Sequence, residues 1–505
     1  MEKVNASQES PKNSGKIENQ DGVVPEHDDH DNAACADTYN ISAHPDESDH
    51  LGEDLVLIRG DAIGDTLYSA RFVLSTLLKL TKVEKELAEN EGFENDLCSV
   101  WDMTIEEDVV QLLLEHNVLE LFAHSINITD DKRLVEILVG ILGNMCNFKS
   151  ARDSLIENTT LVQTLLDLTN CSDSLTLLQL TRLFSVVLIH ADREIALRWY
   201  RHICLYPDFA KNITFILSNS INEQLLRQTM ETLNAILAKF AIIEPNQNNS
   251  GLDNGDETEA ANILPTFPEI FVKEDLIKAT TEAFLALLPR KDNSDPQENL
   301  DDDDDDDDDG NMIILTQSTH NLMQIFLNIH CILTQYEDLS QSCYFLHIES
   351  LMECIGYILE PMCNPKYKEH LSNQEQDLLD SINDIFESLG DPFDERCLIY
   401  TISIWNLLRE ENEQIARRTP PNNEFEENEL KDDDFNFETA YLTILDMIVR
   451  IINAATDAQL ENIFKENLDE NMKNLKNTLS IGDNDQSTKR CYLKIQNILQ
   501  NIQKK

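Results

Sequence analysis

Three asparagines within otherwise apolar helical stretches offer the clearest chemistry in this chain. They are Asn144 in Leu-Gly-Asn-Met, Asn328 in Leu-Asn-Ile and Asn406 in Trp-Asn-Leu. An asparagine amide both donates and accepts hydrogen bonds, so a row of such amides can hold the backbone of an extended peptide. Asparagine disfavours helix interiors, because its side chain competes for backbone hydrogen bonds. The three residues therefore predict either contacts with a bound peptide or buried amides that bond to a neighbouring helix.

Trp101 is the second candidate for contact with a partner. It precedes Thr104, which together with Glu107 matches a capping box that starts a helix through Val109. In that arrangement Trp101 lies just outside this helix and anchors the preceding one on its neighbours. The alternative is an exposed tryptophan that binds a protein partner, since tryptophan is frequent at the energetic centres of interfaces.

Two weaker motifs lie near the N-terminus. Residues 26–31 alternate histidine with carboxylates, a donor set that suits a divalent metal. Their surroundings are polar and acidic and predict no fixed geometry, so we expect neither a metal site nor a cofactor. Residues 56–58, Val-Leu-Ile after Glu-Asp, resemble a peptide that binds SUMO by adding a strand to a sheet edge. The alternative is that they are the first apolar residues of the fold.

Motifs for catalysis are missing from the sequence. It contains no glycine-rich phosphate loop, no G-x-S-x-G, no H-E-x-x-H and no paired-cysteine motif. Carboxylates are abundant, but nothing selects one pair for acid–base work. We therefore expect a protein that is not an enzyme.

The elements that must position these residues are short helices in a repeat of about 41 residues. Asn117 returns as Asn158 and Leu134 returns as Leu175, and a third, looser copy covers Arg193–Phe240. Within each copy apolar residues recur at three- and four-residue steps, which is helical spacing with one face for a core. Asn117 and Asn158 mark sharp turns between helices, where a positive φ favours asparagine or glycine.

This repeat length lies in the range of armadillo-type repeats and predicts an all-α, armadillo-like right-handed α-solenoid. One such unit cannot bury its apolar face alone, so it implies stacked neighbours and an extended surface for binding. The composition agrees, because the 505-residue chain has only 14 glycines, 14 prolines and 7% aromatic residues.

The formal net charge of −55 is concentrated between the helical blocks. Such acidic runs repel themselves and predict disorder. They divide the chain into a disordered acidic tail (1–54), a repeat block (55–243), a linker (244–262), a short helical segment (263–290), a poly-Asp linker (291–311) and C-terminal helical repeats (312–505) with an acidic loop near 418–436. In this last part we expect helices at 312–336, 344–359, 374–389, 396–417, 440–455 and 491–502.

Composition also restricts partners and compartment. A polyanion of this strength excludes nucleic-acid phosphate as the main ligand. It suits a basic protein partner, and the alternative is that it simply keeps an apolar solenoid soluble. No segment has the roughly 18 uninterrupted apolar residues of a membrane helix, and the N-terminus lacks an apolar signal core, so we expect a soluble intracellular protein. The 11 cysteines show no close pair, which predicts free thiols in a reducing compartment.

Three segments resemble the serum amyloid A-like family, also called synoviocyte proliferation-associated. They are Ile63–Ser69, Cys98–Val109 and Val139–Met145, and the resemblance extends from Ile63 to Phe240. It implies an armadillo-like fold, a largely nuclear location with the cytoplasm as alternative, and in vertebrates a role in promoting proliferation of synovial fibroblasts under inflammatory stimulation. It provides no catalytic residues.

These expectations lead to a non-catalytic protein-interaction scaffold of the nucleus. In peptide-binding armadillo proteins an asparagine near the end of each third helix faces the groove, and Asn144 occupies that place. Import receptors carry tryptophan one turn earlier, where this chain has Gly140, so binding of nuclear-import signals is not expected. The alternative function is an acidic chaperone or adaptor for a basic protein, without a discrete peptide groove.

Overall fold

The computed structural model describes residues 61–82, 91–243, 265–289, 316–363, 371–418, 437–466, 469–481 and 485–504. These ranges all belong to one unit, Gly60–Lys505. They are helical and contain no strand, only an isolated bridge between Ala62 and Ser69. The predicted tail, the linkers at 244–262 and 291–311, nearly all of the loop at 418–436, and the motifs at 26–31 and 56–58 lie outside the described residues.

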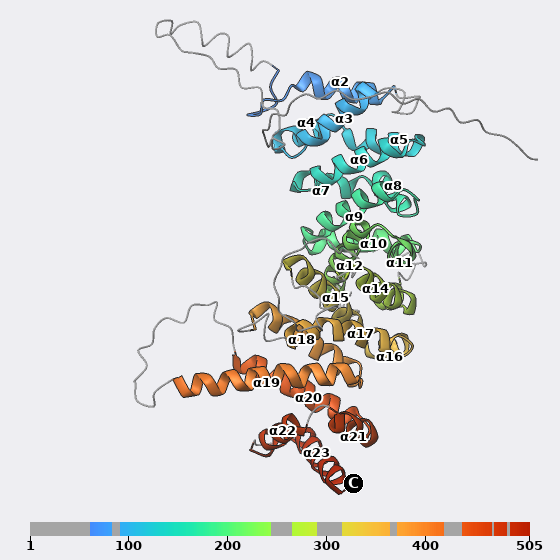
Figure 1. Cartoon of the computed structure of the whole chain (residues 1–505). Helices are drawn as coiled ribbons and strands as arrows, with labels where there is room; N and C mark the ends of the chain where they lie inside the picture. The colour runs from blue at the N-terminus through green and yellow to red at the C-terminus, as the bar shows by residue number, and fades with distance from the viewer. Residues whose placement is uncertain are drawn as a thin grey trace, which may run out of the picture. The chain divides into compact units, whose positions relative to one another are not determined.

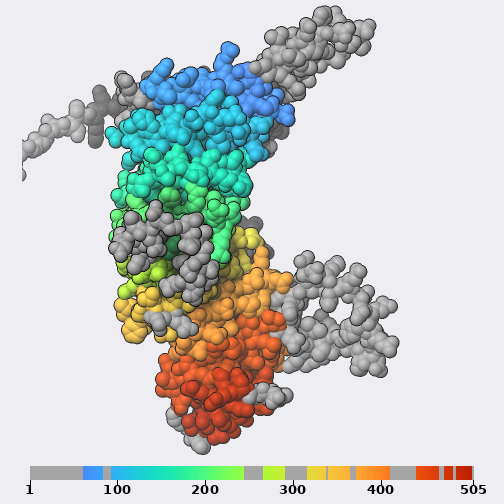
Figure 2. Space-filling view, turned by 180° about the vertical axis from the view of Figure 1, so that it is seen from behind, coloured from blue at the N-terminus to red at the C-terminus, as the bar shows by residue number. Residues whose placement is uncertain are grey.

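The last helix of each repeat packs on the last helix of the next repeat. Together these helices form a stack that we call the third-helix column (Figure 1). In order its members are α3 (Glu91–Met103), α6 (Lys132–Met145), α9 (Ser174–Ile189), α12 (Glu223–Ile243), α15 (Gln317–Thr334), α18 (Asn373–Ser388), α20 (Phe437–Ala454) and α23 (Gln486–Lys504). Each member contacts the next. The space-filling view agrees, because segments adjacent in sequence form adjacent coloured bands from blue to red (Figure 2).

A second-helix column runs beside the first. It comprises α5 (Val118–Ile128), α8 (Thr159–Leu168), α11 (Phe209–Asn219), α14 (Glu274–Leu287), α17 (Ile348–Leu359) and α19 (Glu395–Arg418). The short first helices are α4 (Glu107–Glu115), α7 (Lys149–Glu157), α10 (Arg193–Leu205), α13 (Phe267–Phe271) and α16 (Glu337–Tyr344). The remaining elements are α2 (Ala70–Leu80), η2 (Glu360–Cys363), α21 (Asp457–Glu466) and α22 (Asp469–Ile481). Three-helix repeats packed in columns confirm the predicted all-α, armadillo-like solenoid.

The segment at 263–290 does not stand apart from the repeats. Its helix α14 packs on α11 and α12, and α15 packs on α12 and α14, so α13, α14 and α15 form one repeat. The poly-Asp run therefore falls between two helices of the same repeat in the sequence. The sequence pattern missed α16, α21 and α22, because their segments are short and mostly polar.

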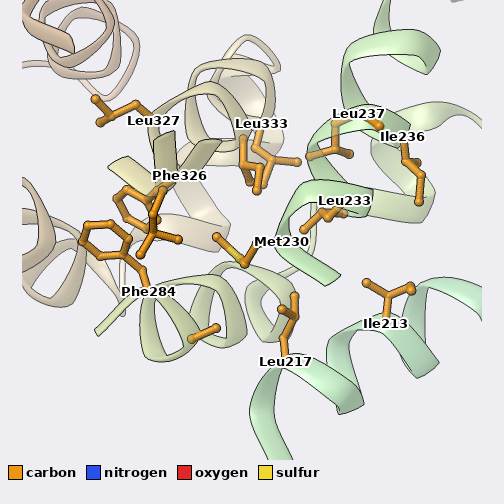
Figure 3. Packing of buried hydrophobic residues seen from close by; sticks show 14 of the residues in the cluster. Ile213, Leu217, Met230, Leu233, Ile236, Leu237, Phe284, Phe326, Leu327 and Leu333 are labelled. Atoms are coloured by element: carbon orange, nitrogen blue, oxygen red, sulfur yellow. The ribbon is translucent and has the colours of Figure 1, made fainter. Parts of the chain in front are cut away.

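Figure 3 shows the core where α14 and α15 pack on α11 and α12. Met230 and Leu233 of α12 are fully buried next to Leu217 of α11. Phe284 of α14 and Phe326 of α15 stack with ring centroids 4.2 Å apart and planes inclined by 23°. Stacked aromatic rings add to the free energy gained from apolar burial, so they fix α15 on α14 across the intervening run of sequence.

The two predicted asparagine turns differ. Asn117 has φ 52° in the left-handed region, as expected. Asn158 has φ −85°, so the predicted positive φ is wrong there. Its side chain instead accepts a hydrogen bond from the Leu161 N–H at 3.0 Å and caps the N-terminus of α8. An asparagine satisfies an exposed helix end as readily as it enters the left-handed region.

The predicted capping box at Thr104 is also wrong. Helix α3 continues to Met103, and the Thr104 hydroxyl donates to the Trp101 carbonyl at 2.6 Å, which closes the end of α3. Helix α4 begins at Glu107 after Glu106, whose side chain caps nothing. Trp101 consequently lies inside α3 and not outside a helix.

Cations satisfy the carbonyl ends of several third helices. Arg152 Nη1 donates to the carbonyls of Cys146 and Asn147, both at 2.8 Å, just after α6. Lys239 Nζ donates to the Ala191 carbonyl at 2.9 Å beyond α9. Lys494 Nζ of α23 donates to the Ile452 carbonyl of α20 at 2.9 Å. A positive charge at a helix C-terminus favours both the unpaired carbonyls and the helix dipole.

Gly140 is required by the packing of α3 on α6. A Cβ added at Gly140 would lie 2.0 Å from the ring of Trp101, whereas a Cβ at Gly143 would meet only Leu183 Cβ at 4.0 Å. The half-buried Trp101 ring therefore covers the backbone of α6, and only glycine leaves room for it.

We predict that Gly140→Ala lowers the free energy of unfolding by about 1–3 kcal/mol, because the added methyl overpacks the Trp101 ring. Gly143→Ala is the matched control, since alanine favours a helix over glycine by up to about 1 kcal/mol and meets no clash. Thermal and urea unfolding of both variants checks this. Equal stability of the two would show that Trp101 does not lie on Gly140.

Candidate protein-interaction surface

Asn144 joins three consecutive third helices. Its Nδ2 donates to the Trp101 carbonyl of α3 at 3.1 Å, and its Oδ1 accepts from Arg182 Nη2 of α9 at 3.1 Å. The residue is only 7% exposed. Both amide atoms are thus engaged within the chain, in the manner of a buried amide that bonds to neighbouring repeats. A contact between Asn144 and a bound peptide stays a prediction.

The other two asparagines occupy different places. Asn328 is half-buried on α15 of the third-helix column, and its Oδ1 accepts from Gln324 Nε2 at 2.8 Å. Asn406 lies on α19 of the second-helix column and not, like Asn144, on a third helix. It is 9% exposed, and neither of its amide atoms has a hydrogen-bond partner. The structure does not place Asn144, Asn328 and Asn406 next to one another.

Trp101 is half-buried against Gly140 and packs α3 on α6 from within α3. Nothing in the described residues tests whether its remaining exposed part meets a partner, so that role stays a prediction.

One stripe of α18 carries four carboxylates. Asp377, Asp380, Asp384 and Glu387 follow at steps of three, four and three residues, so they share one side of the helix. Asp446 of α20 lies next to them, since Asn383 Nδ2 of α18 approaches its Oδ2 at 3.4 Å. We call these five residues the acidic face. The sequence pattern had marked only the runs between helices as acidic, although helical spacing within the predicted helix at 374–389 would have found this stripe.

A cavity of about 440 Å³ lies at the acidic face, between α15 and α18. The residues that line it are all of polar or charged types and include Asn321 and Gln324 of α15 as well as Asp377 and Asp384 of α18. A polar, carboxylate-lined depression suits a cationic group better than an apolar one.

Arg450 of α20 forms ion pairs at one end of the acidic face. Its guanidinium lies 2.8 Å from Asp446, 2.9 Å from Glu387 and 3.2 Å from Asp391. The Asp384 side chain is exposed overall, but partial desolvation by its neighbours, and then repulsion by Asp380 and Glu387, raises its pKa, while Arg450 acts in the opposite direction. Negative charge at Asp384 is therefore only partly compensated within the chain.

A different surface follows α11. Cavities of about 860 and 580 Å³ lie on either side of this helix, and Lys211, Phe215 and Asn219 line both. The Phe215 side chain is 66% exposed. The lining of this surface is mixed, because the larger cavity includes charged residues of both signs, such as Glu269 and Lys273, and the smaller one includes several asparagines.

Metal binding and thiol reactivity depend on the histidines, cysteines and carboxylates of the described residues. No group of three His, Cys, Asp or Glu side chains among them could hold a metal ion. The ten cysteines in the described ranges are free thiols, and burial raises the pKa of Cys146, Cys331 and Cys491 to about 12, which keeps these thiols protonated and unreactive. No single described helix is long and apolar enough to span a membrane; α20 and α21 meet that criterion only as a pair bent by 120°.

We predict that Asn144→Ala lowers the free energy of unfolding by about 1–3 kcal/mol, because the Trp101 carbonyl and the Arg182 guanidinium both lose a buried partner. Asn328→Ala serves as control, because it removes one half-exposed contact with Gln324. It should change the free energy of unfolding by less than about 0.5 kcal/mol. Chemical unfolding of the full chain measures both. Unchanged stability of Asn144→Ala would contradict its bridging role.

Two substitutions that each remove one negative charge should have opposite effects at neutral pH. Asp384→Asn should raise the melting temperature, because the raised pKa means that ionisation of Asp384 disfavours the folded state. Asp446→Asn should lower stability by up to about 1 kcal/mol, because it weakens the pair with Arg450. The gain from Asp384→Asn should disappear below about pH 3, where the carboxyl is protonated in both states. Melting curves at several pH values test this, and a gain that persists in acid would contradict the electrostatic cause.

Comparisons with known proteins give a partial likeness. No family model matches the chain. Protein SAAL1 of Homo sapiens is 35% identical over 190 residues, which cover 35% of this chain and 40% of the human protein. Protein saal1 of Danio rerio is 32% identical over 215 residues, which cover 41% of this chain and 45% of the fish protein. The match thus spans less than half the length of these curated relatives.

Among solved structures, a designed armadillo repeat protein aligns with a TM-score of 0.37 at 10% identity, over 62% of this chain and 98% of the design. A crystal complex of SYS-1 and POP-1 aligns with a TM-score of 0.44 at 11% identity, over 90% of this chain and 67% of that one. Over about a third of its length, then, the chain is similar to proteins named SAAL1, and its described residues form an all-α solenoid.

Proposed function

We propose that this protein is a non-catalytic interaction scaffold that holds a protein partner along its third-helix column. The observation that carries the proposal is a line of polar side chains across neighbouring members of the column. Arg227 Nη1 of α12 donates to the Ser318 carbonyl of α15 at 3.4 Å, Gln324 Nε2 of α15 approaches Ser381 Oγ of α18 at 3.5 Å, and Thr443 Oγ1 of α20 donates to Asp380 at 2.8 Å. Arg227 and Gln324 are half-buried, so part of each side chain stays accessible to an extended partner that crosses several consecutive repeats.

The nuclear location and the role in cell proliferation belong to this proposal. Their support is the resemblance to the serum amyloid A-like family, together with the 35% identity to human SAAL1 over part of both chains. A partner of basic character is supported by the net charge of −55.

A second candidate is an acidic adaptor that attracts a basic protein through its acidic runs, without a groove. The run of nine aspartates at 301–309 favours it. Salt separates the two functions, because long-range attraction weakens as the Debye length falls from about 10 Å at 0.1 M to about 3 Å at 1 M. A partner held by amide contacts and apolar burial should lose much less affinity over the same range.

The scaffold is tested by photo-cross-linking of the full chain. We predict that a photoreactive residue at Asn328 on α15 cross-links to protein partners in nuclear extract, because Asn328 is half-buried and bonds to Gln324 of the polar line. The same residue at Glu282, exposed on α14 of the second-helix column, is the matched control. Identical products from both positions, or products from Glu282 alone, would place the partner elsewhere on the molecule.

A further inference from the structure

The acidic face has many hydrogen-bond acceptors and few donors. Its five carboxylates accept hydrogen bonds and cannot donate when ionised. Within the described residues, the ion pairs of these carboxylates all go to Arg450. Asp377 and Asp384 are exposed and have no ion pair of their own there. The chain thus gathers negative charge at this place without supplying matching cations.

Two buried amides next to the carboxylates also lack a donor. Gln376 is 9% exposed, and its Nε2 donates to Asp380 Oδ1 at 2.7 Å, but its Oε1 accepts no hydrogen bond. Asn383 Oδ1 is likewise buried without a partner, while its Nδ2 faces Asp446. A buried oxygen without a donor costs free energy, which a donor from outside would recover.

We propose that the acidic face binds an extended, Lys- and Arg-rich segment of the protein partner. This inference rests on the proposed scaffold function and names the partner's chemistry and its place. Lysine and arginine carry donors and positive charge and no acceptor, which complements exposed carboxylates beside buried amide oxygens that lack a donor. The polar cavity of about 440 Å³ beside Asp377 and Asp384 provides room for one such side chain.

The spacing of the face fits an extended chain. Carboxylates three or four residues apart on α18 are separated by about 4.5–6 Å along the helix axis. Side chains on the same side of an extended segment repeat at about 6.6 Å. A segment with basic residues at alternate positions can therefore place successive cations near successive carboxylates.

The test uses the full chain and a fluorescent peptide in which lysine alternates with serine. We expect Asp377→Asn with Asp384→Asn to weaken binding of this peptide about tenfold at 0.1 M salt, since two exposed charge contacts are removed. The control is Asp301→Asn with Asp302→Asn in the poly-Asp run, which removes the same charge from a different place and should change affinity less than about twofold. Melting curves confirm that both double variants are folded.

The outcomes separate the site from general attraction. Tenfold weakening by the pair on α18 alone supports the proposal. Equal weakening by both pairs would show that the peptide responds to the charge of the whole chain, and no weakening by the pair on α18 would place the peptide elsewhere; either result overturns the proposal. If the peptide result overturns this proposal but Asn328 still cross-links to a protein partner, the proposed scaffold function remains supported. The failure of the acidic-face proposal can thus be told apart from the failure of the scaffold function.

Discussion

Burial of each third helix between two neighbours is the constraint on which the rest of the structure depends. Every residue of α6 from Leu134 to Met145 is buried, although the helix is only 14 residues long. A short helix of this kind gains its stability from packing and not from its own hydrogen bonds. The close approach of Trp101 to Gly140, the bridging amide of Asn144 and the cations at the helix ends all follow, because every polar or bulky group near the column must be accommodated by the adjacent repeat.

The same constraint separates structural amides from those free to bind. At α6 the Asn144 amide is hydrogen-bonded to Trp101 of α3 and to Arg182 of α9. From α15 to α20 the column carries exposed carboxylates, half-buried amides and a cavity lined by polar residues. Binding capacity is therefore expected in the later repeats, whereas the most regular part of the sequence pattern is in the earlier ones.

A solenoid also tolerates long acidic insertions. Each repeat contacts only its neighbours, and the entropy cost of closing a loop grows slowly with loop length. The run between α14 and α15 interrupts a repeat in sequence, yet Phe284 still stacks on Phe326. The extreme charge of the chain can thus be carried between helices, where it promotes solubility, while a smaller set of carboxylates is held in fixed positions on α18 and α20.

The sequence by itself determined the helical class, the repeat length, most third helices and the absence of catalytic motifs, because helical periodicity and composition are local properties. It did not determine the end of α3, the conformation of Asn158 or the short helices α16, α21 and α22, since turn and cap residues such as Thr104 and Asn158 satisfy several local geometries equally well. It also could not rank the asparagines, because whether an amide is bonded depends on residues about 40 positions away, as Trp101 and Arg182 are from Asn144. Only the tertiary structure decided which polar groups are hydrogen-bonded to a neighbouring repeat and which remain available to a partner.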